Sequence, residues 1–352
     1  MAIVAISVCA QAPATYYNNA TGTGYTLKTQ LYNIIRGHNT QSYDNLYDCY
    51  ETSDRDYFYE NDGTVLDIYS ENPTGTDPYN YSATTRGDRC GNYSVEGDCY
   101  NREHLFPQSV FNRASPMVSD AHHILPTDGK VNGQRDNWPF GKVGTANWTS
   151  SNGSKRGSNL NSGYSAGFTG TVFEPIDEFK GDVARCILYM AVRYENVIAN
   201  WNNWEMLDGT NNHVFNNWAL NTLLTWHAQD PVSAREVTRN NAVYTYQGNR
   251  NPFIDHPEYA ASIWGTVAGI DDVFAAAVAV YPNPAVNNTV NIYSETTLDE
   301  IELINLNGQL VQRIQKPHAV SNTYTVAQLP QGLYLLKATS GSQTVTKKII
   351  VN

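Results

Sequence analysis

The chain has 352 residues, of which 16% are charged and 12% aromatic, and its net charge is −11 at pH 7. This length allows more than one domain, and the abundance of Tyr, Asn, Thr, Ser and Gly argues against a cytosolic helical enzyme. The negative charge argues against broad nonspecific affinity for nucleic acid. The sequence contains no run of eighteen apolar residues, so it predicts no membrane-spanning helix.

The chain begins with MAIVAISVCAQA, which is short, apolar and ends in small residues. We interpret residues 1–11 as the remnant of a secretory signal peptide, with an ordinary first strand as the alternative. When Cys9 is set aside, an even number of cysteines remains, which fits export to an oxidising compartment. These cysteines predict two disulfides, Cys90 with Cys99 and Cys49 with Cys186.

Two strongly periodic segments predict helices. Residues 25–37 carry apolar side chains at helical spacing and end in glycine, which predicts an amphipathic helix. Residues 182–199 carry one apolar stripe and predict the central core helix, and a further helix is expected at 215–227. Between the predicted helices at 25–37 and 182–199, the segment VLDIYS at 65–70 predicts a strand. Residues 144–171 are rich in Gly, Ser, Asn and Thr, which predicts a long loop over the polar segment that precedes it.

The character of the sequence changes near residue 268, because every Trp and every Cys lies before it. Short strand-like runs separated by turn residues then recur, which predicts a small all-β sandwich at 281–352, joined by a linker at 269–280. The predicted strands are 289–293, 298–305, 309–314, 322–326, 332–338 and 344–351.

Three segments of this terminal region occur in a characteristic order: the YPNP opening, INLNGQLV and the final LPQGLYLLKATSGSQTVTKKIIV. Together they resemble the C-terminal sorting domains of the type IX secretion system. The resemblance implies export through the periplasm to the cell surface or the medium, with the type IX machinery as partner. A carbohydrate-binding or surface-binding β module is the alternative.

The polar segment at 99–141 combines an Arg-Glu-His triplet, a His-His pair and an Asn-rich stretch. Residues 101–160 hold seven Lys or Arg against four Asp or Glu, a basic surplus of three in an acidic chain. These residue types can hold a hard divalent metal beside a general base, which phosphodiester hydrolysis requires. The segment is therefore the candidate site.

Glu103 offers a carboxylate for the metal and His104 an imidazole for the proton. Adjacent side chains on a strand point to opposite faces, so both serve one site only if the strand ends there, as Pro107 suggests. Asp128, or the threonine before it, can cap a helix that carries Asn132 toward Glu103. Because Mg²⁺ keeps most of its waters, one carboxylate and one amide suffice to hold it.

The ordered segments NREHLFPQS, SDAHHILPTDGKVNGQRDNWPFG and GDVARCILYM resemble the endonuclease I family of ββα-metal, or His-Me finger, nucleases. The resemblance runs from about Tyr25 to Gly265. It implies an α+β fold: a ββα-metal core with additional helices at 12–268, followed by the β sandwich. It further implies that Glu103 and Asn132 bind Mg²⁺, with Mn²⁺ or Ca²⁺ as substitutes.

The resemblance also implies roles for the remaining polar residues. His104 corresponds to the general base, and His123 either ties the two strands together or approaches the metal. Arg102, Arg135 and Arg185 are candidates for contact with the scissile phosphate. For Arg185 a structural ion pair is an equal alternative, because it lies on the apolar helix at 182–199.

Some polar residues of the region have simpler explanations. We interpret His122 as a hydrogen-bonded core histidine, Asn137 as a turn cap and His256 as structural. The sequence has no zinc-binding Cys or His pattern and no glycine-rich phosphate loop after a strand, which argues against a zinc protease and an ATPase.

These observations predict a secreted, monomeric, metal-dependent endonuclease that cuts DNA and RNA with little sequence specificity and leaves 5′-phosphates. One alternative is a phosphodiesterase for smaller esters, in which residues 144–171 would form a closed pocket. The other is a non-catalytic surface module that binds nucleic acid or mediates adhesion.

Overall fold

The computed structural model describes residues 11–201, 203–265, 278–294, 296–305, 309–340 and 343–351. The chain divides into two compact units, Met1–Thr266 and Val267–Asn352. Most of the predicted signal-peptide remnant and most of the predicted linker lie outside the described residues.

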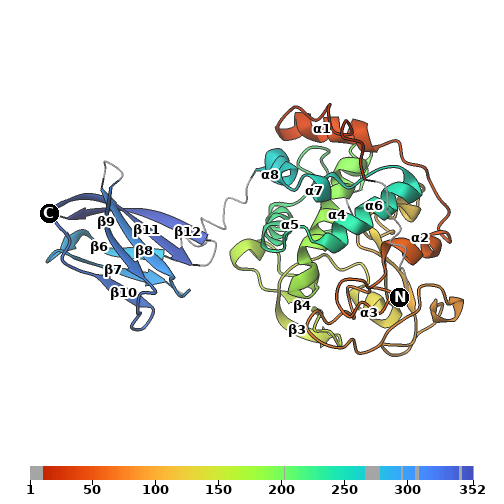
Figure 1. Cartoon of the computed structure of the whole chain (residues 1–352), viewed down its shortest axis with the longest axis horizontal. Helices are drawn as coiled ribbons and strands as arrows, with labels where there is room; N and C mark the ends of the chain where they lie inside the picture. The colour runs from red at the N-terminus through yellow and green to blue at the C-terminus, as the bar shows by residue number, and fades with distance from the viewer. Residues whose placement is uncertain are drawn as a thin grey trace, which may run out of the picture. The chain divides into compact units, whose positions relative to one another are not determined.

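The first unit combines helices with short antiparallel strands, and the second is built from strands, so the predicted α+β class is confirmed (Figure 1). The helices of the first unit are α1 Gly24–Ile35, α2 Leu46–Ser53, α3 Gly129–Arg135, α4 Lys180–Arg193, α5 Asn217–Gln229, α6 Ala234–Gln247, α7 Pro252–Asp255 and α8 Glu258–Trp264. Its strands are β1 Tyr100–His104, β2 Ile124–Asp128, β3 Val143–Thr149, β4 Lys155–Asn159 and β5 Thr171–Glu174. Among the described residues no helix has both the length and the apolarity needed to cross a bilayer.

Helix α4 runs through the middle of the first unit, with α5 and α7 beside it (Figure 1). The prediction of a central core helix is confirmed, although α4 ends at Arg193 and not at residue 199. All its side chains are buried, not only one stripe, because its charged residues have partners inside the protein. Lys180, for example, pairs with Glu174 at 2.6 Å. The predicted helices at 25–37 and 215–227 are confirmed as α1 and α5.

The segment VLDIYS is not a strand, and that prediction was wrong. Val65 forms one isolated bridge with Arg55, after which the chain turns. The turn is stabilised by Asp67, whose carboxylate accepts hydrogen bonds from the backbone N–H groups of Tyr69 at 2.8 Å and Asp128 at 2.8 Å. The apolar residues are buried without strand pairing, which produced the strand-like pattern. Val65, for example, belongs to a buried cluster with side chains of α2, β1 and α6.

Residues 144–171 do not form a long loop, which corrects a second prediction. They contribute β3 and β4, which form a three-stranded antiparallel sheet with β5. Strand β3 is mostly exposed and polar, so it lacks the alternating apolar pattern that would have revealed it. Gly157 permits the close pairing, because a Cβ atom there would collide with the backbone of Thr145.

The candidate site lies on β1, β2 and α3 of the first unit, which follow one another in the order expected of a ββα core. Strands β1 and β2 pair antiparallel, with Glu103 opposite Leu125 and His104 opposite Ile124. The predicted helix start is confirmed: the Asp128 carboxylate caps α3 by accepting the Val131 N–H at 2.8 Å. Helix α3 packs on both strands.

A polar cluster lies at the centre of the first unit, around the fully buried Asp120. Its carboxylate accepts hydrogen bonds from the hydroxyls of Tyr189 and Tyr194 at 2.8 Å and from Gln247 at 2.8 Å. His122 lies beside it, with Nε2 3.0 Å from the Asn249 carbonyl oxygen.

Acid is expected to destabilise this cluster. Burial lowers the pKa of His122 to about 4 in the folded protein, whereas an unfolded histidine titrates near ~6.5. Between these values the unfolded chain binds more protons, so stability falls as pH falls, by about 3 kcal/mol for this residue. Urea unfolding of wild type and His122→Gln between pH 7 and pH 4 checks this. An equally steep pH dependence in the variant would contradict it.

The second unit is all-β, and all six predicted strands are confirmed. Its strands form one seven-stranded sheet, so the packing of two sheets as a sandwich stays a prediction. The strands, with β6 added, are β6 Val278–Val286, β7 Thr289–Ser294, β8 Glu300–Asn305, β9 Leu310–Gln315, β10 Thr323–Val326, β11 Gly332–Ser340 and β12 Gln343–Val351. Their order is β10-β7-β6-β12-β11-β8-β9. Strand β6 was missed because Pro282 and Pro284 argue against a strand; the structure accommodates both where the β6–β7 register shifts.

Candidate functional site

A cavity of about 660 Å³ opens at the point where β1 ends. Its walls come from β1, from α3 and from the loop between β1 and β2. The lining residues include Tyr43, Asn101, Arg102, Glu103, His104, Arg113, Asn132 and Arg135. Glu103, His104 and Asn132 therefore line one space, as predicted, although no contact between them fixes their roles.

Glu103 is a buried carboxylate with only 2% of its surface exposed. It accepts a hydrogen bond from the Tyr69 hydroxyl at 3.0 Å, and Arg135 lies 3.4 Å away. Burial raises the pKa of Glu103, and the Arg135 charge opposes that rise. Tyr69 follows the Asp67 turn, so the misread VLDIYS segment serves to orient this carboxylate.

His104 is the last residue of β1, and its ring lies between those of Tyr43 and His123. Nε2 lies 3.2 Å from the Val118 carbonyl oxygen. A carbonyl oxygen can only accept, so Nε2 carries the proton and Nδ1 carries the lone pair. Burial lowers the pKa of His104 to about 3, which keeps the ring neutral. A neutral, fixed imidazole can act as a general base.

His123 lies next to His104 and is fixed in the same way. Its Nε2 is 2.9 Å from the Met117 carbonyl oxygen, one residue before the carbonyl that holds His104. Its own carbonyl accepts the Leu105 N–H at 3.1 Å, which extends the β1–β2 pairing by one residue. These contacts favour the strand-tying role for His123, which is not among the residues lining the cavity.

Asn132 lies on α3, and its Nδ2 donates a hydrogen bond to the Asn101 side chain. Asn101 and Glu103 are two residues apart on β1 and so share a face of the strand. The hydrogen bond therefore turns Asn132 toward the face of β1 that carries Glu103. Because Nδ2 is the donor, the amide oxygen of Asn132 is the atom left for a ligand.

The donor set fits a hard divalent cation. The Glu103 carboxylate and the Asn132 amide supply oxygen ligands, and both line a cavity that is large enough for metal-bound waters. This is the ligand chemistry of Mg²⁺, Mn²⁺ and Ca²⁺. Zinc is a poorer match, because its usual ligands are Cys, His and carboxylate.

Arg135 is buried behind the strand end, with 1% of its surface exposed. It donates to the carbonyl oxygens of His104 at 2.9 Å and Leu105 at 2.6 Å. These bonds satisfy backbone carbonyl groups at the end of β1, where the pairing with β2 ends, and they fix the position of the strand end. The geometry favours a positioning role for Arg135 over direct contact with a phosphate.

Arg102 points to the other face of β1, yet reaches the rim of the same cavity. It donates to the Tyr43 carbonyl at 2.8 Å, pairs with Asp44 at 2.9 Å and stacks over the rings of Tyr43 and Tyr47. Arg113 is exposed and lines the cavity as well. Sequence reasoning missed Arg113, whose only signal was its place in the 99–141 segment.

Arg185 does not join the site. Its guanidinium is fully buried and forms two hydrogen bonds with the Glu236 carboxylate, the longer at 2.8 Å, and one with the Asp230 carbonyl at 2.8 Å. This is the structural ion pair that was the alternative for Arg185. It joins α4 to the start of α6, where Glu236 also completes the capping box of that helix.

The cysteine predictions are untested. Cys90 lines the cavity, and both Cys90 and Cys99 are thiols in this structure. Burial raises the pKa of the Cys90 thiol. The pairing of Cys49 with Cys186 stays a prediction too.

The described residues of 143–174 do not line the cavity, so this segment does not close a pocket over it. That observation removes the feature on which the small-ester phosphodiesterase rested. An elongated substrate can pass across the cavity without meeting a lid from this part of the chain.

Comparison with known proteins gives matches to both units. The endonuclease I family matches residues 23–258, and the secretion system C-terminal sorting domain matches residues 279–352. An extracellular ribonuclease of Bacillus amyloliquefaciens is 37% identical over 255 residues, which cover 71% of this chain and 78% of that protein. The extracellular ribonuclease of Bacillus subtilis is 36% identical over 255 residues, which again cover 71% of this chain and 78% of that protein.

A solved structure of PorZ, described as a surface component of the type IX secretion system of Porphyromonas gingivalis, is 18% identical to this chain. The match covers 25% of this chain and 13% of the PorZ chain, with a TM-score of only 0.19.

Proposed function

The chain belongs to the endonuclease I family, and from this premise we propose that it is a metal-dependent endonuclease that cuts both RNA and DNA at internal phosphodiester bonds. The chain is an exported hydrolytic nuclease, by its family and by its sorting domain. The observation that supports the finer proposal is the end of β1, which brings Glu103 and a neutral His104 to one cavity.

The proposed reaction is direct hydrolysis. His104 accepts a proton from water at Nδ1 as the water oxygen attacks phosphorus, and the 3′ oxygen departs. The phosphate stays bonded to the 5′ oxygen of the downstream fragment, and the upstream fragment ends in a 3′-hydroxyl. Glu103 and Asn132 hold the divalent cation, which when bound stabilises negative charge on the phosphate and on the leaving oxygen.

The same chemistry accounts for both substrates. Water is the nucleophile, so the ribose 2′-hydroxyl is not needed and DNA is cut as well as RNA. The two Bacillus relatives are named extracellular ribonucleases, which supports RNA as one substrate. Contacts to the backbone carry no base information, which accounts for low sequence specificity.

The type IX machinery is the proposed partner of the C-terminal unit, which matches the sorting domain. Export through the periplasm would then place the nuclease at the cell surface or in the medium. The non-catalytic alternative predicts tight nucleic-acid binding without turnover, and Mg²⁺-dependent cleavage by purified protein distinguishes the two.

Arg113 is expected to hold a phosphate of the substrate, since it is an exposed cation on the cavity wall. Arg113→Ala should raise KM about 10-fold with a smaller change in kcat. It should also reduce the slope of log affinity against log salt concentration by about one unit, the contribution of one phosphate contact. Arg156→Ala removes a charge from the same basic segment outside the cavity, and should leave KM unchanged. Equal effects of both substitutions on KM would contradict the assignment.

A further inference from the structure

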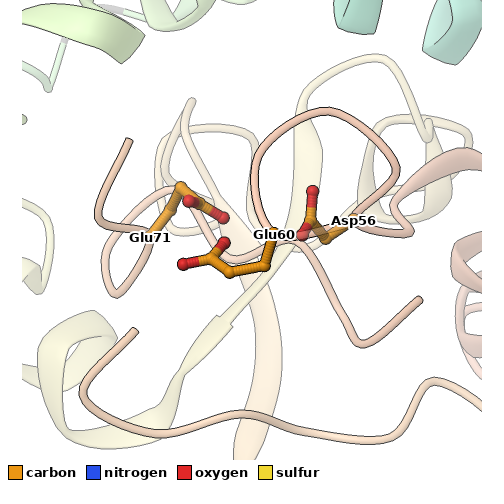
Figure 2. A group of neighbouring side chains, drawn as sticks. All are labelled: Asp56, Glu60 and Glu71. Atoms are coloured by element: carbon orange, nitrogen blue, oxygen red, sulfur yellow. The ribbon is translucent and has the colours of Figure 1, made fainter. Parts of the chain in front are cut away.

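Three acidic side chains meet outside the candidate active site. Asp56, Glu60 and Glu71 each place one carboxylate oxygen within 4.8 Å of the others. Figure 2 shows the carboxylates of Glu60 and Glu71 pointing toward one another, with Asp56 on the far side of Glu60. Carboxylates repel each other at this separation unless a proton or a cation lies between them.

Glu71 is the member of this cluster that most requires a partner. It is fully buried, with 0% of its surface exposed, and no donor among the described residues reaches either carboxylate oxygen. Both carboxylate oxygens of Glu60 are buried and lack a donor from the described residues as well. Buried charges in proteins are normally paired or bound to a metal.

Asp56 is held in place by the backbone. One oxygen accepts the N–H groups of Phe58 and Tyr59 at 3.0 Å, and the other accepts that of Asn61 at 2.9 Å. The loop therefore wraps around this carboxylate and fixes its direction before any ligand arrives. Outer hydrogen bonds of this kind orient metal ligands.

From this geometry we propose that Asp56, Glu60 and Glu71 bind a structural Ca²⁺ ion, at a site separate from Glu103 and Asn132. The three ligands are carboxylates from a loop, and Ca²⁺ takes six to eight oxygen ligands in flexible geometry, backbone carbonyls and waters included. Mg²⁺ prefers to keep its waters, and zinc prefers nitrogen or sulfur.

The electrostatics of the cluster agree with an added positive charge. Burial, together with Asp77, Glu60 and Asp56, raises the pKa of Glu71 to about 9. Burial, together with Glu60, Asp56 and Asp62, raises the pKa of Asp77 to about 6.

The bound ion would stabilise a segment that supports the active site. Glu71 follows the turn in which Tyr69 donates to Glu103 and Asp67 accepts the Asp128 N–H. Asn152 holds the same turn from the other side, donating to the carbonyls of Ile68 and Glu71. Any effect of this Ca²⁺ on activity rests on the proposed function, whereas its binding does not.

Thermal unfolding of the full chain tests the proposal, first in EDTA and then in CaCl₂. Ca²⁺ at a hundredfold excess over Kd is expected to raise Tm by roughly 5–10 °C. The Glu103→Gln variant lacks the catalytic metal site, which can also take Ca²⁺, so the increase that this variant keeps measures binding at the acidic cluster. A failure of the proposed function therefore leaves this result intact.

Two variants identify the ligands. Glu71→Gln should lose the Ca²⁺-dependent increase, and in EDTA it should melt near the wild-type temperature because Gln keeps the size of the side chain. Glu60→Gln, at a less buried position, should also lose the Ca²⁺-dependent increase in Tm. This variant replaces Glu71→Gln in the test if Glu71→Gln does not fold. Glu205→Gln, an exposed control, should keep it.

Three results would overturn the proposal. The first is a wild-type Tm that does not respond to Ca²⁺, which would mean that the acidic cluster shares a proton instead. The second is an undiminished Ca²⁺ response in Glu71→Gln and Glu60→Gln. The third is a response that disappears in Glu103→Gln, or that Mg²⁺ reproduces at equal concentration in that variant.

Discussion

His104→Ala is expected to lower kcat by about 10³-fold or more, because no other described side chain at the end of β1 presents a fixed, neutral imidazole to the cavity. The Val118 carbonyl holds the proton on Nε2 and leaves Nδ1 as the base. Removal of the ring leaves water without a proton acceptor. Cleavage of plasmid DNA at saturating Mg²⁺ measures the loss.

The fold of this variant must be checked, since His104 is buried against Tyr43 and His123. We expect a lower Tm but an unchanged circular dichroism spectrum. Added imidazole can enter the cavity that the ring leaves and should restore part of the activity. His256→Ala, which removes a histidine outside the cavity, is the matched control. Near-normal cleavage by folded His104→Ala would refute the assignment of the base.

Glu103→Ala is expected to abolish both cleavage and the response to added metal. Glu103 is the carboxylate among the proposed ligands, and an amide alone binds a hard cation weakly. Glu103→Gln keeps the size of the side chain and a partner for Tyr69, and removes only the charge. It should therefore be nearly as inactive as Glu103→Ala while losing less stability.

Titration of activity against Mg²⁺ measures this effect, with Arg156→Ala as the control for charge in the same basic segment. Activity in either Glu103 variant that rises with Mg²⁺ as in the wild type would show that the metal binds elsewhere. Glu103→Gln is expected to fold, because Arg135 keeps its bonds to the carbonyls of His104 and Leu105.

The placement of the main site residues could be predicted because short-range signals carried it. Pro107 indicated that β1 ends near His104, and Asp128 indicated the start of α3, so Glu103 and Asn132 were expected to meet. The structure places both on one cavity. The six terminal strands were equally clear, because turn residues separate each apolar run from the next.

Features that depend on tertiary contacts could not be predicted. The Arg135 side chain turns inward to the carbonyls that end β1, which no local pattern reveals. The apolar residues of 65–70 are buried in the core of the first unit, yet they do not pair as a strand. Strand β3 is polar because its faces are mostly exposed, and it pairs with β4 where Gly157 allows close approach.

The acidic cluster shows the same limit. Asp56, Glu60 and Glu71 are spread over sixteen residues of a segment rich in Asp, Glu and Tyr, and no metal-binding spacing connects them. Only the turn around Asp56 and the burial of the segment that follows bring Glu71 to the other two.

The central claim is metal-dependent hydrolysis of both nucleic acids, and one measurement tests it most directly. Purified full chain is incubated with supercoiled plasmid and with total RNA, in Mg²⁺ and in EDTA, and the ends of the products are mapped. The account predicts cleavage of both substrates in Mg²⁺ alone, with 5′-phosphates. Cleavage in EDTA, products with 3′-phosphates, or intact substrates from folded protein would contradict it.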